Sequence, residues 1–413
     1  MSKMPIAALL FLLFAASPAA QAENVDVAGV DIGVTGYADL RGIVTPDQGS
    51  WIDGELGKTR YGDASNPDFR LAEIVGQIRA QITGELSAVA VGRIESKQRT
   101  FADVLEAYLR YRPVSVSAWR WTFTAGAFFP PVSLENTEIG WTSPWTLTPS
   151  AINSWVGEEL RTIGAEGRVE WRSDERTIGV VGSIYGWNDP AGVLMADRGW
   201  ALDDRPTGLI DHPRIPDVIA YARHLPEPLT TPEFMDIDKK PGWYAGASWD
   251  ENGVGRIEVL RYNNDADPTI IRDGVVAWRT DFWSAGARTN IGPVTLLAQG
   301  MRGETYIKPS PFFFSDTYFE SAYLLAGYEM GDWRFAARAD VFSTDESHRG
   351  TSIKMSEHGN AFTAAINWLP YDWLRLTTEW LRVDSTRRQR ITDDLDARQV
   401  DNQIQLSAKL YLN

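Results

Sequence analysis

Short runs in which apolar and polar residues alternate constrain this chain more than any other feature of its sequence. In the run 119–128, one face carries Trp121, Phe123, Ala125 and Ala127, and the other carries Arg120, Thr122, Thr124 and Gly126. A period of two is the period of a β-strand, whose successive side chains point to opposite faces. One face of this run suits hydrocarbon and the other suits water. The pattern predicts an all-β chain, and a transmembrane antiparallel barrel gives both faces these surroundings.

Further runs of this kind extend along the chain and bring the expected number of strands to sixteen. Short turns and long loops alternate between them, as in an up-and-down barrel with turns on one side of a membrane and loops on the other. The longest connection, 188–241, is the expected long extracellular loop. The expected strands lie at about 34–43, 70–83, 87–95, 105–112, 119–128, 161–171, 177–187, 242–250, 255–263, 277–289, 294–303, 317–328, 333–343, 361–368, 373–383 and 402–412.

The N-terminal residues 1–22 have the features of a secretory signal peptide. Lys3 precedes an apolar run, and Ala20-Gln21-Ala22 forms a small-x-small cleavage site. Residues 23–413 then form a single barrel domain. Cysteine is absent, which excludes a disulfide framework and a thiolate site. The net charge of −15 argues against a nucleic-acid partner, because phosphate binding needs a basic face. The 17 Trp residues suit the aromatic girdles of a membrane barrel.

The segment 129–160 interrupts the pattern and is too long for a hairpin turn. It carries three Trp, four Pro and four Glu, and in a barrel a loop of this kind can fold inward and narrow the pore. We therefore expect the third long loop to be a constriction loop. Its candidate functional residues are Glu135, Glu138, Trp141, Trp145, Trp155 and Glu158.

Two local motifs resemble the phosphate-selective porin family, the O and P type porins of the outer membrane. Gly126-Ala-Phe-Phe-Pro-Pro-Val-Ser-Leu-Glu135 is similar to the family's entry into its constriction loop, and Asp103-Val-Leu-Glu-Ala-Tyr-Leu-Arg110 is similar to a stretch on the preceding strand. The match covers about a tenth of the chain. The resemblance implies a sixteen-stranded, trimeric porin of a Gram-negative outer membrane, in contact with outer-membrane lipid.

Two departures from the family pattern bear on selectivity. The family selects anions with Arg and Lys at the constriction, whereas residues 129–160 contain neither. The chain also ends in Asn413 rather than in an aromatic residue. Phosphate selectivity therefore does not follow from the resemblance.

Charged residues that alternate with the apolar ones should face a water-filled lumen. Arg79, Arg93 and Arg110 lie on successive strands and form an expected basic strip opposite the acidic loop, with a transverse field across the pore. Alternatively, these arginines pair with acids and stabilise the wall. For the three Trp residues, anchoring of the loop is favoured over stacking with solutes. The candidate channel-lining residues are Arg41, Arg79, Arg93, Arg110, Arg120, Arg168, Arg334, Arg338 and Arg375.

The sequence argues against an enzyme. All four His fall in expected loops, at His212, His224, His348 and His358, so no strand offers the His that a hydrolase on the barrel wall needs. We expect no cofactor and no metal, and Asn263-Asn-Asp-Ala-Asp267 is interpreted as a solvated turn. The expected function is passive diffusion of small hydrophilic or ionic solutes, including anions such as phosphate. Two alternatives stay open: a secreted or periplasmic all-β carbohydrate binder, and a barrel-embedded hydrolase.

Overall fold

The computed structural model describes residues 25–27, 29–62, 67–95, 100–217, 230–349 and 355–412. The expected signal peptide and Asn413 lie outside these residues. The barrel strands are β2 (Val30–Val44), β3 (Asp68–Gln81), β4 (Leu86–Ile94), β5 (Ala102–Tyr111), β6 (Trp119–Phe128), β7 (Thr162–Arg172), β8 (Arg176–Gly186), β9 (Gly242–Glu251), β10 (Gly255–Asn263), β13 (Arg279–Ile291), β14 (Val294–Ser310), β15 (Phe313–Met330), β16 (Trp333–Arg349), β17 (Glu357–Tyr371), β18 (Leu374–Arg387) and β19 (Arg398–Leu412).

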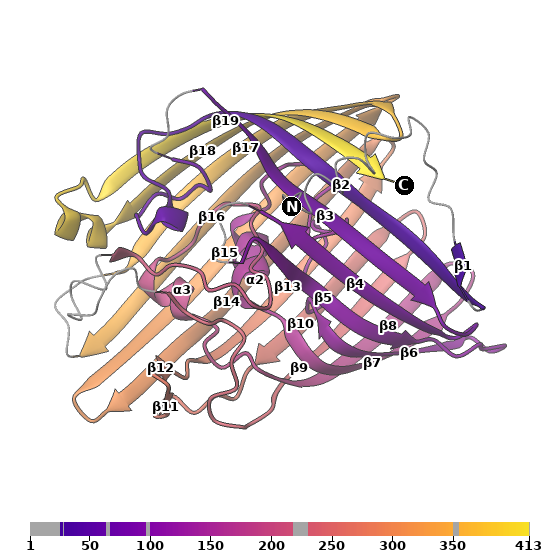
Figure 1. Ribbon diagram of the computed structural model, residues 1–413, viewed down its shortest axis with the longest axis horizontal. Helices are drawn as coiled ribbons and strands as arrows, with labels where there is room; N and C mark the ends of the chain where they lie inside the picture. The colour runs from indigo at the N-terminus through magenta and orange to yellow at the C-terminus, as the bar shows by residue number, and fades with distance from the viewer. Residues whose placement is uncertain are drawn as a thin grey trace, which may run out of the picture.

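These sixteen strands form one closed antiparallel barrel (Figure 1). Each strand pairs with the next along the chain, and β19 closes the ring on β2, with Leu406 opposite Gly42. A short strand, β1 (Val25–Val27), pairs with the start of β2, and a small hairpin of β11 (Ile271–Arg272) and β12 (Val275–Val276) lies between β10 and β13. The expected all-β barrel of sixteen strands is confirmed, and a soluble two-sheet sandwich is excluded.

Adjacent residues of a strand meet opposite surroundings, as a period of two requires. On β15, Leu324 is 58% exposed on the outer face, whereas Leu325 is fully buried inside. Aromatic rings gather beside the short turns, where Trp333 stacks on Trp368 at 5.5 Å. This outer surface has the apolar band and aromatic rim of a membrane barrel.

Two β-bulges change the expected facing of single residues. The pairing of β2 with β3 passes from Glu73 to Leu71 and leaves Ala72 as the extra residue, and the pairing of β4 with β5 leaves Leu105 in the same way. We expected both residues on the outer face. They are instead 2% and 0% exposed, because a bulge shifts the alternation by one residue.

Several strands are longer than expected at the long-loop end. Strand β14 runs to Ser310 rather than to about 303, and β16 runs to Arg349 rather than to about 343. Beyond the apolar band the outer face carries polar residues such as Glu304, Lys308 and Asp345, so backbone pairing continues where the alternation of polarity has ended. The alternation of apolar and polar residues therefore predicts only the part of each strand within the apolar band, and not the full length of the strand.

The largest hydrophobic core lies inside the barrel. It joins side chains of the inner wall, such as Phe282 and Phe319, to residues of two loops that fold inward, such as Trp155 and Trp200. We expected the inner face to line a polar, water-filled lumen, and this was wrong for the sector of wall that the loops cover. Among the described residues, no helix has the length and apolar character needed to cross a membrane.

Candidate functional site

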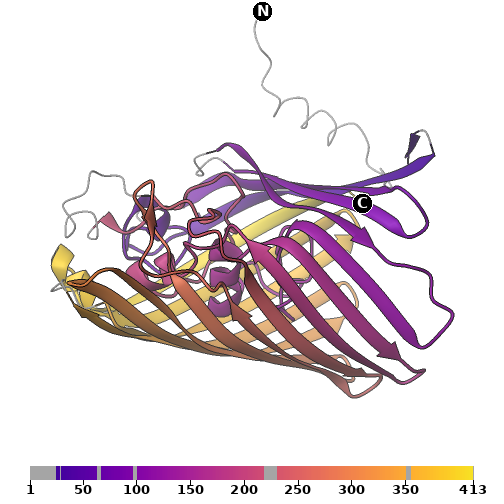
Figure 2. The same cartoon turned by 90° about the horizontal axis from the view of Figure 1, so that it is seen from below.

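The loop between β6 and β7, residues 129–161, folds into the barrel as expected. Its helix α2 (Ala151–Glu159) lies within the ring of strands in both views (Figures 1 and 2), and all nine of its residues are buried. Ser150 caps the helix, because its side-chain oxygen accepts a hydrogen bond from the backbone N–H of Asn153. The constriction loop, as we call residues 129–161, thus has a defined structure inside the lumen.

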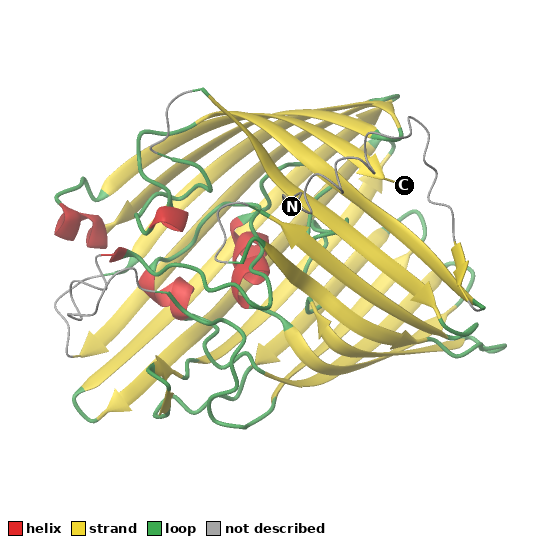
Figure 3. Ribbon diagram, viewed as in Figure 1, coloured by secondary structure: helices red, strands yellow, loops and turns green. Residues whose placement is uncertain are grey.

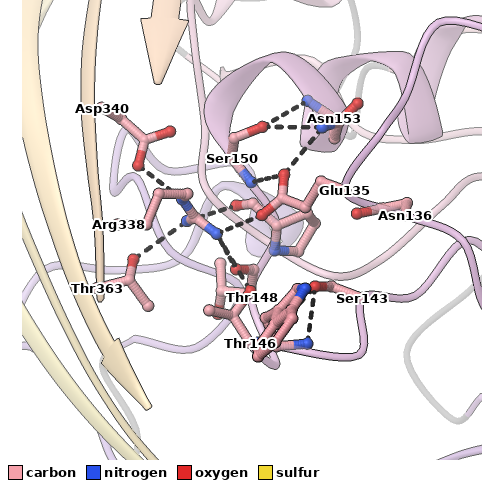
Figure 4. Close-up of polar contacts among 12 residues, drawn as sticks. Glu135, Asn136, Ser143, Thr146, Thr148, Ser150, Asn153, Arg338, Asp340 and Thr363 are labelled. Carbon is pink, nitrogen blue, oxygen red and sulfur yellow. Dashed lines mark hydrogen bonds and ion pairs between the residues drawn. The ribbon is translucent and has the colours of Figure 1, made fainter. Parts of the chain in front are cut away.

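Arg338, on the inner face of β16, fastens the constriction loop to the wall (Figure 4). Its guanidinium donates to Glu135 at 2.7 Å, to Asp340 at 2.8 Å, and to the backbone carbonyls of Thr148 and Pro149. All three charged side chains are fully buried. Burial of an ion pair costs solvation energy, which these additional hydrogen bonds offset. The charge of Glu135 is therefore neutralised at the wall.

Two further acids of the constriction loop are also paired. Glu138 accepts hydrogen bonds from Arg375 of β18 at 2.7 and 3.1 Å. Glu158 forms a bidentate ion pair with Arg198, with N–O distances of 2.6 and 2.7 Å, and both of these side chains are buried. We expected the acids of the loop to face a basic strip across open water. The structure corrects this, because each of these acids is turned toward an arginine of its own.

The three tryptophans of the loop have different surroundings. Trp155 is fully buried, with its ring 5.0 Å from that of Phe319 on the wall. Trp145 is 7% exposed, and Trp141 is partly exposed with its ring stacked on Phe129 at 4.2 Å. The burial of Trp145 and Trp155 leaves them no open face for a solute and suits the anchoring role.

The connection between β8 and β9, residues 187–241, also folds inward over the part that the structure describes. We call it the long loop. Its helix α3 (Val193–Asp197) lies inside the barrel next to the strands (Figure 3), with all five residues buried. The carboxylate of Glu159 caps α3 by accepting hydrogen bonds from the backbone N–H groups of Gly192 and Leu194 at 3.0 and 2.8 Å. This second inward loop was not expected from the sequence, in which 188–241 was interpreted only as extracellular.

The loop between β2 and β3 covers the long loop in turn. The guanidinium of Arg198 lies 4.4 Å from the ring of Trp51, and the ammonium of Lys58 lies 2.6 Å from Glu357 of β17. Burial lowers the pKa of Lys58 to about 7, and the neighbouring Glu357 opposes this shift. Three loops thus meet around Arg198 in the barrel interior.

The nine candidate arginines fall into two groups. Four are 6% exposed or less and are paired with acids: Arg41, Arg93, Arg338 and Arg375. Five keep exposed surface: Arg79, Arg110, Arg120, Arg168 and Arg334. Arg93 forms an ion pair with Glu95 at 3.4 Å and is buried in the wall. The expected basic strip of three arginines is therefore reduced to Arg79 and Arg110.

The inner faces of β3 to β13 carry the exposed charge. Arg168 lies 3.9 Å from Glu166, and Arg334 at the opposite wall pairs with Glu329 at 3.0 Å. Four arginines of this sector have no carboxylate oxygen within 4.0 Å among the described residues: Arg79, Arg110, Arg120 and Arg288. Arg288 was not among the arginines expected from the sequence, although it continues the inward-facing residues of β13 after Phe282 and Ser284.

A cavity of about 500 Å³ lies between this sector and the start of the constriction loop. Pro131, Leu134 and Thr137 line it from the loop, and Arg256 and Arg288 line it from the wall. Glu258 also lines it and pairs with Arg256 at 3.1 Å. The cavity opens beside the turn 252–254, at the short-turn end of the barrel.

Two histidines lie in strands, contrary to expectation. His348 is on β16 and His358 is on β17, where it is exposed and stands directly opposite Ser343. A Ser and a His side by side on the outer wall meet one requirement of a hydrolase. However, the hydroxyl of Ser343 donates a hydrogen bond to the carboxylate of Glu320 at 3.3 Å, and among the described residues it has no hydrogen bond to His358. The described contacts therefore do not form a nucleophile and base.

Three acids of the long loop, Asp189, Asp236 and Asp238, place carboxylate oxygens within 4.8 Å of one another. The backbone N–H groups of residues 237 and 238 donate to Asp189, and the ammonium of Lys240 lies 3.9 Å from Asp238. Burial raises the pKa of Asp189 to about 6. These donors and the lysine already compensate the acidic charge, so we assign no metal here.

Comparisons with known proteins give a fold. No family model and no curated protein matches the chain. Among solved structures, the outer-membrane channel DcaP of Acinetobacter baumannii is similar with a TM-score of 0.55 and 11% identity, covering 94% of this chain and 98% of that one. OmpT of Vibrio cholerae in its trimer form is similar with a TM-score of 0.53 and 9% identity, covering 92% and 99%.

The Salmonella typhi OmpF structure, a complex with daunomycin, is similar with a TM-score of 0.51 and 11% identity, covering 93% of this chain and 98% of that one. At sequence identities this low, the similarity shows a shared fold and does not show a shared activity. The chain therefore shares the sixteen-stranded barrel fold of these outer-membrane proteins.

Proposed function

We propose that this protein is an outer-membrane porin, a channel for passive diffusion of small hydrophilic solutes, with a preference for anions. The preference is carried by one observation. Glu135, Glu138 and Glu158 of the constriction loop are each paired with an arginine, whereas Arg79 and Arg110 on the opposite wall have no carboxylate partner among the described residues. These two arginines therefore leave positive charge in the lumen that no described carboxylate within 4.0 Å neutralises.

Fixed charges at a narrow passage select ions through the potential that they create. The whole chain carries −15, but distant exposed charges are screened within about 8 Å at physiological ionic strength. Selectivity should thus follow the local arginines and not the net charge. The solved channels of this fold support the channel itself, and phosphate is one anion that this site would admit.

The test is planar-bilayer conductance of the detergent-purified protein across a salt gradient. We expect stepwise conductance and a reversal potential of the sign that anion preference gives. Replacing Arg79 and Arg110 by Gln should move the reversal potential toward that of a neutral pore. Arg398→Gln is the matched control, because this exposed arginine faces outward on β19 and pairs with Asp384. A reversal potential of the opposite sign would overturn the anion preference.

We further propose that the protein assembles as a homotrimer surrounded by outer-membrane lipid. The support is the fold, since the similar Vibrio cholerae OmpT structure is described as a trimer form. The outer wall of the barrel is apolar, with exposed residues such as Val180, Ile184 and Leu324, and needs a hydrocarbon or protein partner.

A further inference from the structure

Two glutamates meet inside the barrel without any visible donor between them. Glu159 ends helix α2 of the constriction loop, and Glu233 lies in the returning limb of the long loop, residues 230–241. Both side chains are fully buried and lie within hydrogen-bonding reach of each other. Neither carboxyl oxygen of Glu233 has a hydrogen-bond partner among the described residues. Two acceptors in contact in a dry interior need a proton between them.

The surroundings decide which glutamate carries the proton. Glu159 accepts hydrogen bonds from Gly192, Leu194 and Met195 N–H and from the indole N–H of Trp155, so its charged form is solvated by the protein. Glu233 has none of these donors. The proton therefore resides on Glu233, which donates it to the Glu159 carboxylate.

The other charged groups around the pair reinforce this assignment. Glu158, also on α2, faces Glu233 and favours its neutral form, while Arg198 from the long loop opposes this effect. The guanidinium of Arg198 donates a hydrogen bond to the carboxylate of Glu158 at 2.6 Å, so its charge is largely balanced by Glu158. Burial and then the Glu159 carboxylate raise the pKa of Glu233 well above its ordinary value. Burial also raises the pKa of Glu159, to about 7, against the pull of its N–H donors.

The contact joins two elements that narrow the lumen. The backbone supports the same junction, because the side chain of Asn188 donates to the carbonyl of Glu159 at 2.8 Å and to that of Glu233 at 3.5 Å. We propose that one proton shared between Glu159 and Glu233 latches the returning limb of the long loop to the constriction loop, and that its loss at alkaline pH releases the limb and widens the passage. This inference rests on the proposed channel function.

The direction of the pH effect follows from linkage. A carboxyl group whose pKa is raised in the latched state stabilises that state below its ordinary pKa, and this stabilisation is lost as pH rises through the raised value. The latch should therefore hold in mildly acidic solution and release at alkaline pH, as pH rises through the raised pKa of Glu233. The limb would leave because two charged carboxylates cannot share a dry site.

The experiment compares the wild-type protein with Glu233→Gln and with Glu175→Gln, from about pH 5 to about pH 9. Gln keeps the shape of Glu233 and donates an N–H to Glu159 at every pH. Glu175 is an exposed residue of the turn between β7 and β8 and serves as the matched control. One readout is single-channel conductance. The second is deuterium uptake of the limb 230–238, corrected for the intrinsic exchange rate, which needs no channel activity.

We expect conductance and uptake of the wild type and of Glu175→Gln to rise together above neutral pH, and Glu233→Gln to lose both rises. If Glu233→Gln does not give a folded, heat-modifiable barrel, Glu233→Met replaces it, since removal of the carboxyl should abolish the same response. An equal rise of uptake in the Gln variant would overturn the latch. A change that follows calcium or chelator at fixed pH would assign the site to a cation and overturn the proton. Absence of conductance with a pH-dependent uptake would reject the channel and keep the latch.

Discussion

Arg338 shows how much of the constriction depends on one side chain. It holds Glu135 from a position 203 residues away in the sequence and also binds two backbone carbonyls of the loop. Arg338→Ala leaves Glu135 buried without its partner, which typically costs about 3–5 kcal/mol. We expect a loss of that size in urea unfolding of the detergent-solubilised barrel, followed by heat-modifiable gel mobility.

Arg334→Ala is the control on the same strand. Its partner Glu329 is half-exposed, and an exposed pair contributes about 0–1 kcal/mol. Equal losses for the two variants would show that the buried pair does not hold the loop. The same comparison explains what could be predicted from the sequence. Alternation along β16 placed both arginines on the inner face, but it gave no information on their burial, because Glu135 comes from a distant loop.

The two inward loops differ in how far the sequence predicted them. Three tryptophans and a local resemblance indicated the constriction loop between β6 and β7, and its inward path is confirmed. The long loop carries no periodic pattern, and its place inside the barrel depends on contacts such as the cap that Glu159 provides for α3. Such contacts join residues that are 35 positions apart, and no local rule reports them.

Removing the long loop tests its role as an element. Tyr185 of β8 and Gly242 of β9 are direct partners in the sheet, so a short Gly-Ser turn can replace residues 188–241 without breaking the barrel. We expect a larger single-channel conductance, because buried loop residues leave the lumen. Barrel stability should fall, since the apolar inner wall around Phe282 becomes exposed to water.

Replacing the hairpin β11–β12, residues 271–276, by a short turn is the control for this deletion. Its Ile271 is 53% exposed, and its Val275 and Val276 are only partly buried, so the hairpin fills less of the barrel interior than the long loop does. An unchanged conductance after deletion of the long loop, or an equal gain after deletion of the hairpin, would contradict a constricting role for the long loop.

At the scale of the whole molecule, the sequence predicted the barrel because a membrane fixes one surface of every strand. The outer face must be apolar over the thickness of the hydrocarbon, and this requirement repeats sixteen times along the chain. Nothing comparable fixes the inner face. It holds charged residues such as Arg168 and Glu166 in one sector and apolar residues such as Phe319 in another, and the loops that cover each sector decide the difference.

The oligomer is the remaining property of the whole molecule, and it is testable at one outer groove. A groove of about 770 Å³ crosses β17 to β19, β2 and β3, where the first and last barrel strands meet, and Phe69 on its rim is 77% exposed. If this groove is a contact between subunits, Phe69→Arg should convert a trimer into monomers in native mass spectrometry and unheated gels. Ile184→Arg on β8, which is 65% exposed on another part of the wall, should leave the trimer intact. If lipid alone covers the groove, both variants keep the same oligomeric state, and each loses barrel stability by up to about 2–4 kcal/mol according to its depth in the membrane.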